Sequence, residues 1–157
     1  MHKPAMTNEE AKAHRERQVF LEFVRQSALP IDADTIEGRR PPEPDIYCML
    51  GGQGAAFELA ELCNSDLAKE VSRLKKTGGD GQFMMLDDPT PQVFLKKIGK
   101  SYRSNHPVEL LAYTDGILVT PDDVIIPVLQ DLIRTHGCGQ FRRVWLLGEK
   151  TCCEIAP

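Results

Sequence analysis

Apolar and polar residues follow a helical period near the start of the chain. One stripe of apolar side chains recurs at helical spacing: Val19, Phe20, Phe23 and Val24. Such a stripe is typical of the buried face of an amphipathic helix. Thr7 followed by Glu10 fits a capping box, in which the two side chains bond free amides of the first turn. The pattern predicts a helix over residues 8–26, preceded by a mobile polar tail over residues 1–7.

Strand-like patterns follow this helix. Residues 31–36 alternate between apolar and polar after the helix-breaking Pro30, which favours a short strand. Residues 45–50 and 55–62 are mostly apolar, and the glycine-rich segment 51–54 lies between them. Glycine adopts the positive φ angles of a tight reversal. We therefore predict a β-hairpin over residues 45–62.

The rest of the chain continues to alternate between the two patterns. We predict helices over residues 65–76, 90–102 and 120–136, and strands over 82–86, 107–113, 141–147 and 151–155. A strand, a helix and a second strand in succession imply a parallel pair. Residues 8–157 are expected to form one α/β domain with a central mixed sheet flanked by helices.

The hairpin places acidic residues on one face. Whether the turn contains two or four of residues 51–54, Asp45 is expected opposite Ala60 and Tyr47 opposite Glu58. Directly opposed residues share a face, so Asp45 and Glu58 become diagonal neighbours, roughly 7–8 Å apart at the backbone. Two carboxylates at this spacing can converge on one Mg²⁺, which prefers oxygen ligands and keeps several waters.

These residues resemble a known motif. Pro44-Asp45, then a short hairpin, then Glu58-Leu59-Ala60 is similar to the motif of the PD-(D/E)xK nuclease superfamily, the restriction-endonuclease-like fold. The resemblance implies that Asp45 and Glu58 hold Mg²⁺, with Mn²⁺ as a substitute. It also implies a lysine two residues after the second acid, where this chain has Ala60.

The resemblance also raises the question of which other residues complete the site. Lys69 is the first lysine after Glu58 and is the candidate for the missing ammonium, with a solvated helix face as the alternative. The first helix often lends an acid in this family, so Glu22 is a candidate third metal ligand, although solvated glutamates are the rule on helix surfaces. Glu61 is expected on the opposite face from Glu58, where a buried carboxylate needs an arginine partner or a raised pKa. A role at the strand end is the alternative to a structural salt bridge.

Charge and composition narrow the partners. A net charge of −4 argues against a strongly basic nucleic-acid surface. Basic residues nevertheless cluster within 69–76 and within 96–103, and these clusters offer a local positive surface for nucleic acid. Arg39 and Arg40 are either phosphate contacts or solvated loop residues.

Two functions follow from these observations. One is a Mg²⁺-dependent phosphodiesterase acting on nucleic acid. The other is a catalytically inactive protein of the same fold that serves as an interaction module, which the absent lysine and the acidic charge favour. Tyr113 and Trp145 belong either to a core or to a homodimer or protein-partner face.

Cysteine usage bears on the compartment. The chain has 5 cysteines, an odd number, and their spacing lacks the paired pattern of a zinc site. The sequence also contains no apolar run long enough to cross a bilayer. The expectation is a cytoplasmic protein with no membrane association.

Overall fold

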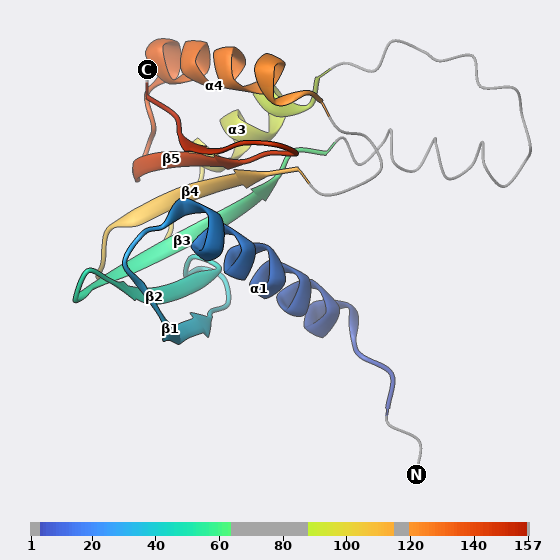
Figure 1. Ribbon diagram of the computed structural model, residues 1–157, viewed down its shortest axis with the longest axis vertical. Coiled ribbons are helices and arrows are strands. Elements are labelled where there is room, and N and C mark those ends of the chain that lie inside the picture. The colour runs from blue at the N-terminus through green and yellow to red at the C-terminus, as the bar shows by residue number, and fades with distance from the viewer. Residues whose placement is uncertain (1–3, 64–87, 115–119, 157) are drawn as a thin grey trace, which may run out of the picture.

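The computed structural model describes residues 4–63, 88–114 and 120–156. They form an α/β fold with helices on both faces of a six-stranded mixed sheet (Figure 1). The helices are α1 (Asn8–Ser27), α3 (Thr90–Ile98) and α4 (Asp122–His136). The strands are β1 (Ile31–Gly38), β2 (Ile46–Leu50), β3 (Gln53–Glu61), β4 (Val108–Tyr113), β5 (Phe141–Leu147) and β6 (Cys152–Glu154).

The order of the strands in the sheet follows their order in the sequence. Strands β1, β2 and β3 pair antiparallel. Strands β3, β4 and β5 pair parallel, and β6 returns antiparallel to β5. The parallel pairing of β4 with β5 around α4 confirms the prediction from the strand, helix, strand succession. The α/β class and the mixed sheet flanked by helices are likewise confirmed.

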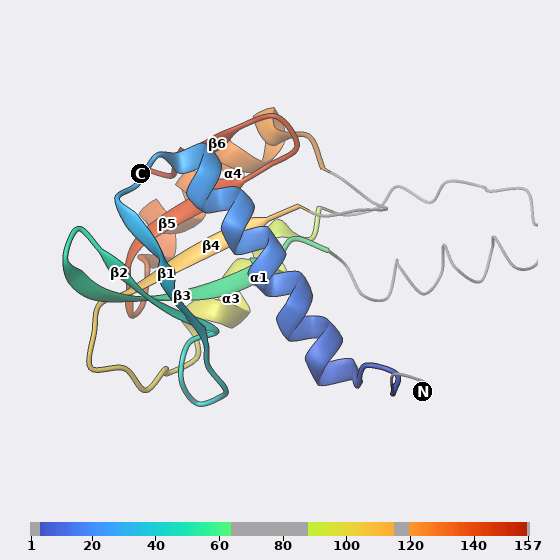
Figure 2. The same cartoon turned by 60° about the horizontal axis from the view of Figure 1, so that its bottom comes forward.

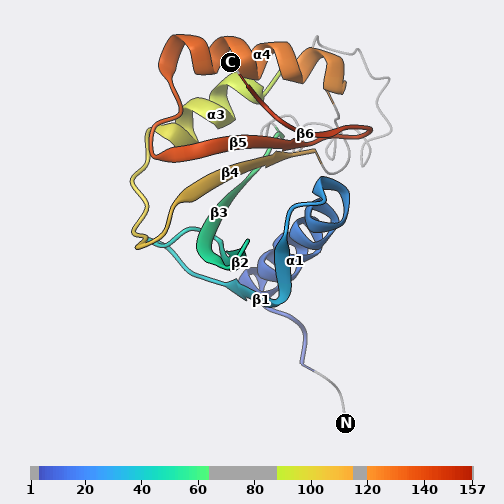
Figure 3. The same ribbon diagram turned by 60° about the vertical axis from the view of Figure 1, so that its left-hand side comes forward.

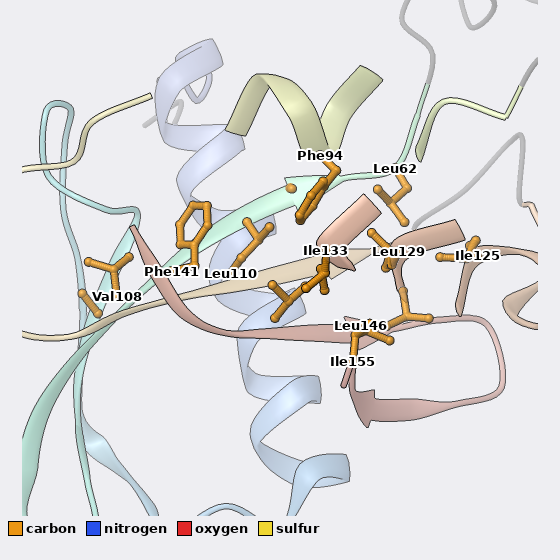
Figure 4. Close-up of a cluster of buried hydrophobic side chains, with 14 residues drawn as sticks. Leu62, Phe94, Val108, Leu110, Ile125, Leu129, Ile133, Phe141, Leu146 and Ile155 are labelled. Atoms are coloured by element: carbon orange, nitrogen blue, oxygen red, sulfur yellow. The ribbon is translucent and has the colours of Figure 1, made fainter. Parts of the chain in front are cut away.

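The two faces of the sheet bury separate apolar clusters. Helix α1 covers one face, and α3 and α4 cover the other (Figures 2 and 3). Under α1, the rings of Phe20, Phe23, Phe57 and Trp145 pack with neighbouring centroids 5.0–5.8 Å apart. Under α3 and α4, Phe94, Leu129 and Ile133 meet side chains from β3, β4 and β5 (Figure 4). Because both faces of such a sheet are covered, successive side chains of its central strands point into two different buried clusters.

The core accounts for the two aromatic residues whose role the sequence left open. Tyr113 is 5% exposed and Trp145 is 8% exposed. Both lie in the cluster beneath α1. These rings therefore belong to the hydrophobic core and do not present a surface to a partner.

Helix α1 begins as predicted. The Thr7 hydroxyl accepts from the Glu10 amide, and the Glu10 carboxylate accepts from the Thr7 amide, which completes the capping box. The helix ends at Ser27, and the next residue, Ala28, caps it with a left-handed φ of 56°. Helix α3, in contrast, ends at Ile98, and its predicted extension to residue 102 was wrong because Gly99 terminates it.

The predicted register of the hairpin was also wrong, by two residues. Ile46 pairs with Phe57, and Leu50 pairs with Gln53, so the turn consists of Gly51 and Gly52. Their φ angles are +58° and +79°, and two successive positive φ angles suit a two-residue hairpin turn. A shift of two residues keeps every side chain on its predicted face, because strand side chains alternate with a period of two.

Several predictions fall outside the described residues, including the helix at residues 65–76 and the strand at 82–86. None of the helices in the three described ranges is both long and apolar enough to cross a membrane.

Candidate functional site

The acidic pair lies where β2 begins. Because Ile46 pairs with Phe57, Asp45 is directly opposite Glu58 and not opposite Ala60. The Asp45 amide donates to Oε1 of Glu58 at 3.1 Å, and the Leu59 amide donates to Oδ2 of Asp45 at 2.9 Å. Each carboxylate is therefore fixed by a backbone amide of the other strand. The two acids are closer than the diagonal arrangement that the sequence predicted.

A lysine completes this pair, from a helix that the sequence predicted but did not link to the acids. Lys97 on α3 donates from Nζ to Oε2 of Glu58 at 2.8 Å. Phe94, one turn earlier, is 1% exposed and anchors α3 on the sheet (Figure 4). Residues three apart on a helix share a face, so this anchor aims Lys97 at the sheet. In the sequence, Lys97 is only one member of the basic cluster within residues 96–103.

The position two residues after Glu58 is closed to a lysine. Ala60 is 2% exposed and belongs to the apolar cluster beneath α3 and α4. A buried ammonium there would lack a partner and would be costly. Lys97 instead brings its ammonium to Glu58 from above the sheet.

Burial and a neighbouring negative charge raise the pKa of both acids, although the neighbour differs between the two. For Asp45 the largest cause is burial, followed by the negative charge of Glu16. For Glu58 the causes that raise the pKa are burial and then Asp45, while Lys97 opposes them. Two like charges held close in a poorly solvated place disfavour their ionised forms. A bound cation would relieve this repulsion.

Tyr102 packs against the same carboxylate. Its hydroxyl donates to the Lys97 carbonyl at 3.3 Å, and its pKa is raised by burial and then by the charge of Glu58. Its backbone is fixed by Gln140, whose side-chain amide accepts from the Tyr102 amide at 2.8 Å and donates to its carbonyl at 2.7 Å. This clamp holds the segment after α3 over the acidic pair.

A cavity of about 390 Å³ opens beside Asp45, between the first half of α1 and the ends of β1 and β2. Glu16 on α1 lines it together with Asp45, and the guanidinium-bearing residues Arg17, Arg39 and Arg40 line it as well. Glu16 influences the pKa of Asp45 by its charge. The acid that α1 brings to the site is thus Glu16.

Among the described residues, neither of two predicted site residues, Glu22 and Lys69, is found at the acidic pair. Glu22 bonds Arg25 and Gln26 along α1 and lines a different cavity, with Tyr113 and Leu147. It lies about 1.7 turns of α1 beyond Glu16, so it is not gathered with the acidic pair. Lys69 lies outside the described residues.

Comparison with known proteins adds no relative. No protein-family model matches this chain, and neither a curated protein nor a solved structure shows significant similarity to it.

Other charged residues have structural partners. Glu61 forms an ion pair with Arg15 of α1, which is the arginine partner that its position required. Glu109 is fully buried and accepts from Arg142, from Arg143 in two bonds and from the Trp145 indole. Sequence patterns gave no sign of this second cluster, because Glu109 is a single acid within an apolar strand.

The carboxylate oxygens of Asp45 and Glu58 are the type of ligand that a hard cation such as Mg²⁺ prefers. Among the described residues, no three His, Cys, Asp or Glu side chains form a complete metal-binding group. Mg²⁺ does not require one, since it commonly takes one or two carboxylates and keeps waters or substrate phosphate oxygens as its other ligands. Asp45 and Glu58 would be the two carboxylates of such a site, and Glu16 lines the cavity beside Asp45.

Proposed function

We propose that this chain is a metal-dependent phosphodiesterase acting on nucleic acid, of the PD-(D/E)xK type and restriction-endonuclease-like fold. The observation that carries the proposal is the convergence of Asp45, Glu58 and the Lys97 ammonium at one end of the hairpin. The order of a helix, an antiparallel hairpin and a parallel strand also supports it. The proposal rests on this arrangement and on the motif, and not on any relative.

In this mechanism Asp45 and Glu58 would hold Mg²⁺, and Mn²⁺ could replace it. When bound, the metal would supply Lewis-acid stabilisation of the phosphate. Glu58 is oriented by the Asp45 amide and by Lys97, so its carboxylate is already in position before a substrate arrives. Preorganised groups of this kind cost no reorganisation during the reaction.

Lys97 supplies the ammonium that the motif has at the position of Ala60. Its Nζ bonds Glu58 in the absence of substrate, and three donors on one ammonium allow a second bond to a phosphate oxygen. A positive charge there stabilises the negative charge that grows in the transition state. The cavity beside Asp45, with Arg17, Arg39 and Arg40 in its wall, gives the phosphate backbone a place to enter.

One observation favours the alternative, an inactive module of the same fold. Backbone amides and Lys97 already satisfy Asp45 and Glu58, as in a structural polar cluster. Such a cluster would keep the hairpin and α3 together without catalysis. The two functions differ in whether the acids bind a cation.

Calorimetric titration with Mn²⁺ separates them. The wild type is expected to bind one ion, and Asp45→Asn and Glu58→Gln to lose most of that binding. Asp131→Asn is the matched control, because Asp131 is an exposed acid on α4. Cleavage of plasmid and single-stranded DNA should follow the same order among the variants. Absent binding, or equal binding by all four proteins, contradicts the metal-dependent function.

A further inference from the structure

The face of the hairpin that carries the two acids continues into a stack of rings and a guanidinium. The Arg39 guanidinium lies 5.1 Å from the centroid of the Tyr47 ring. The Tyr47 and His106 rings have centroids 5.0 Å apart and are inclined by 46°. We call Arg39, Tyr47 and His106 the aromatic stack. Tyr47 follows Asp45 by two residues and shares its face, so the stack begins about 7 Å along the strand from the acidic pair.

The absence of a side chain at Gly54 makes room for this stack. A Cβ atom at position 54 would lie 2.6 Å from Nδ1 of His106 and 3.0 Å from the Tyr47 hydroxyl. The backbone of His106 is held by Ser104, whose hydroxyl accepts from the His106 amide at 3.1 Å and donates to its carbonyl at 2.8 Å. The histidine ring is therefore fixed beside Tyr47, although residue 106 is exposed.

The cation of the stack is loosely held. Arg39 donates to Glu43 at 3.2 Å and to Glu37 at 3.3 Å, and its buried Nε has no hydrogen-bond partner. The 3.2 Å approach of Nε to Glu37 is close enough for an ion pair, but it lacks the direction of a hydrogen bond. Such long bonds to acids at or near the surface are weak. Arg39 can exchange them for a phosphate, which accepts two bonds from one guanidinium.

A second basic segment meets the loop that carries Arg39. The Arg103 amide donates to the Pro42 carbonyl at 2.9 Å. This bond joins the basic segment after α3 to the loop that carries Arg39 and Arg40. Two exposed arginines are therefore close to the stack along the chain: Arg40 follows Arg39 directly, and Arg103 precedes His106 by three residues.

From this juxtaposition we infer that the nucleic acid bound at the site is single-stranded, with a base against His106 and Tyr47 and its phosphates toward Arg39 and Arg103. The inference rests on the proposed function for the identity of the ligand as a nucleic acid. Bases within a duplex are stacked on their neighbours and cannot reach a protein ring, whereas unpaired bases can. Aromatic rings beside a cationic track are the usual means of binding single strands.

Binding measured in EDTA tests this without any catalysis. Fluorescence anisotropy would compare a labelled oligo(dT) with a duplex of equal length for the wild type, His106→Ala, Tyr47→Leu and Gly54→Ala. We expect the single strand to bind at least about tenfold more tightly than the duplex. Each variant should weaken single-strand binding about tenfold, because one stacked base contributes roughly 1–3 kcal/mol and 1.4 kcal/mol is tenfold.

Matched variants make the result specific. His136→Ala removes an exposed histidine at the end of α4 and should leave the affinity unchanged. Gly54→Ala keeps both rings but displaces His106, so it tests the stack even if Tyr47→Leu is poorly folded. Equal affinity for single strand and duplex, or unchanged affinity in the Gly54→Ala and His106→Ala variants, overturns the inference.

The outcomes also separate this inference from the proposed function. Plasmid cleavage that depends on Asp45, together with stack variants that bind like the wild type, would remove the inference and leave the enzyme. Single-strand binding that depends on the stack, without Mn²⁺ binding or cleavage, would leave the inference as a description of a binding module.

Discussion

Lys97 and Glu58 are separated by 39 positions in the sequence, yet Nζ of the lysine lies 2.8 Å from Oε2 of the glutamate. The side chains of both residues are largely covered, with 20% and 8% exposed. A charge pair in such surroundings is strongly coupled, because solvent screens it little. The pair links α3 to β3 and fixes the ammonium at the acidic end of the hairpin.

Lys97→Met should lower both stability and activity. The variant leaves Glu58 beside Asp45 without its cation, and loss of one partner of a buried pair costs about 3 kcal/mol. The cost should shrink as the pH falls, since the pKa of Glu58 is already raised by burial and by Asp45 and the carboxyl can take up a proton. Urea unfolding at pH 8 and at pH 5 measures the loss of stability and its pH dependence, and plasmid cleavage measures the activity. Lys100→Met, at an exposed position, is the control, and an equal loss at the two pH values would contradict the coupling.

Asp45→Asn is expected to stabilise the fold while removing metal binding. The raised pKa of Asp45 means that the folded protein holds this proton more tightly than the unfolded chain does. This tighter proton binding therefore stabilises the fold fully below the ordinary pKa of 3.8. The stabilisation is lost as the pH rises through the raised pKa of the folded state. An uncharged asparagine avoids that loss.

In EDTA at pH 8 the asparagine variant should gain about 1 kcal/mol in unfolding free energy. The gain should disappear below pH 3.8, where the aspartate is protonated. Thermal unfolding across this range measures the difference, with Asp131→Asn as a control. A variant less stable than the wild type at pH 8 would show that the Asp45 carboxylate serves the fold.

Placing the lysine of the motif at position 60, in Ala60→Lys, should not raise the cleavage activity. The side chain at position 60 points into the cluster beneath α3 and α4, where an ammonium has no room and no partner. We expect a loss of about 3 kcal/mol in unfolding free energy, measured by urea unfolding. Ala60→Leu serves as an uncharged control for size. Higher cleavage activity in Ala60→Lys with unchanged stability would mean that position 60 is open to the substrate.

The sequence allowed the local elements to be predicted well. The capping box of Thr7 and Glu10 and the two strands of the hairpin have strong local signals, because each depends on neighbouring residues. The prediction that Asp45, Tyr47 and Glu58 share one side of the hairpin was also correct. Side chains of a strand alternate between its two faces, so a register shift by two residues leaves each side chain on the same face.

The parts that failed depend on contacts between distant residues. The glycines of the turn permit several loops, and only packing selects Gly51 and Gly52. Glu16 and Glu22 border the same buried stripe of α1, and nothing local tells which of them faces Asp45. Lys97 is one of several lysines near the end of α3, and its role follows from the anchoring of Phe94 against the sheet. The segment that contains Lys69 lies outside the described residues, so its candidate lysine remains a prediction.

Glu109 offers a prediction that is independent of the site. Burial, the largest single influence, raises the pKa of this carboxyl, but the bonds from Arg143, Arg142 and Trp145 together bring its pKa below the ordinary value. A lowered pKa gives stability that is present above the ordinary value of 4.5 and is lost as the pH falls through the folded value. The cluster should therefore stabilise the ends of β4 and β5 at neutral pH.

Glu109→Gln is expected to lose about 3 kcal/mol at pH 7, because two guanidinium groups lose their carboxylate. The difference in unfolding free energy between Glu109→Gln and the wild type should become smaller below pH 4.5. Trp145 is the only tryptophan and donates to Glu109, so its fluorescence reports both unfolding and the local change. Urea is the proper denaturant, since the ions of guanidinium chloride would screen the pairs. Glu149 is an exposed turn residue, so Glu149→Gln should unfold like the wild type. A loss of unfolding free energy in Glu109→Gln that does not change with pH would point to altered packing and not to lost charge.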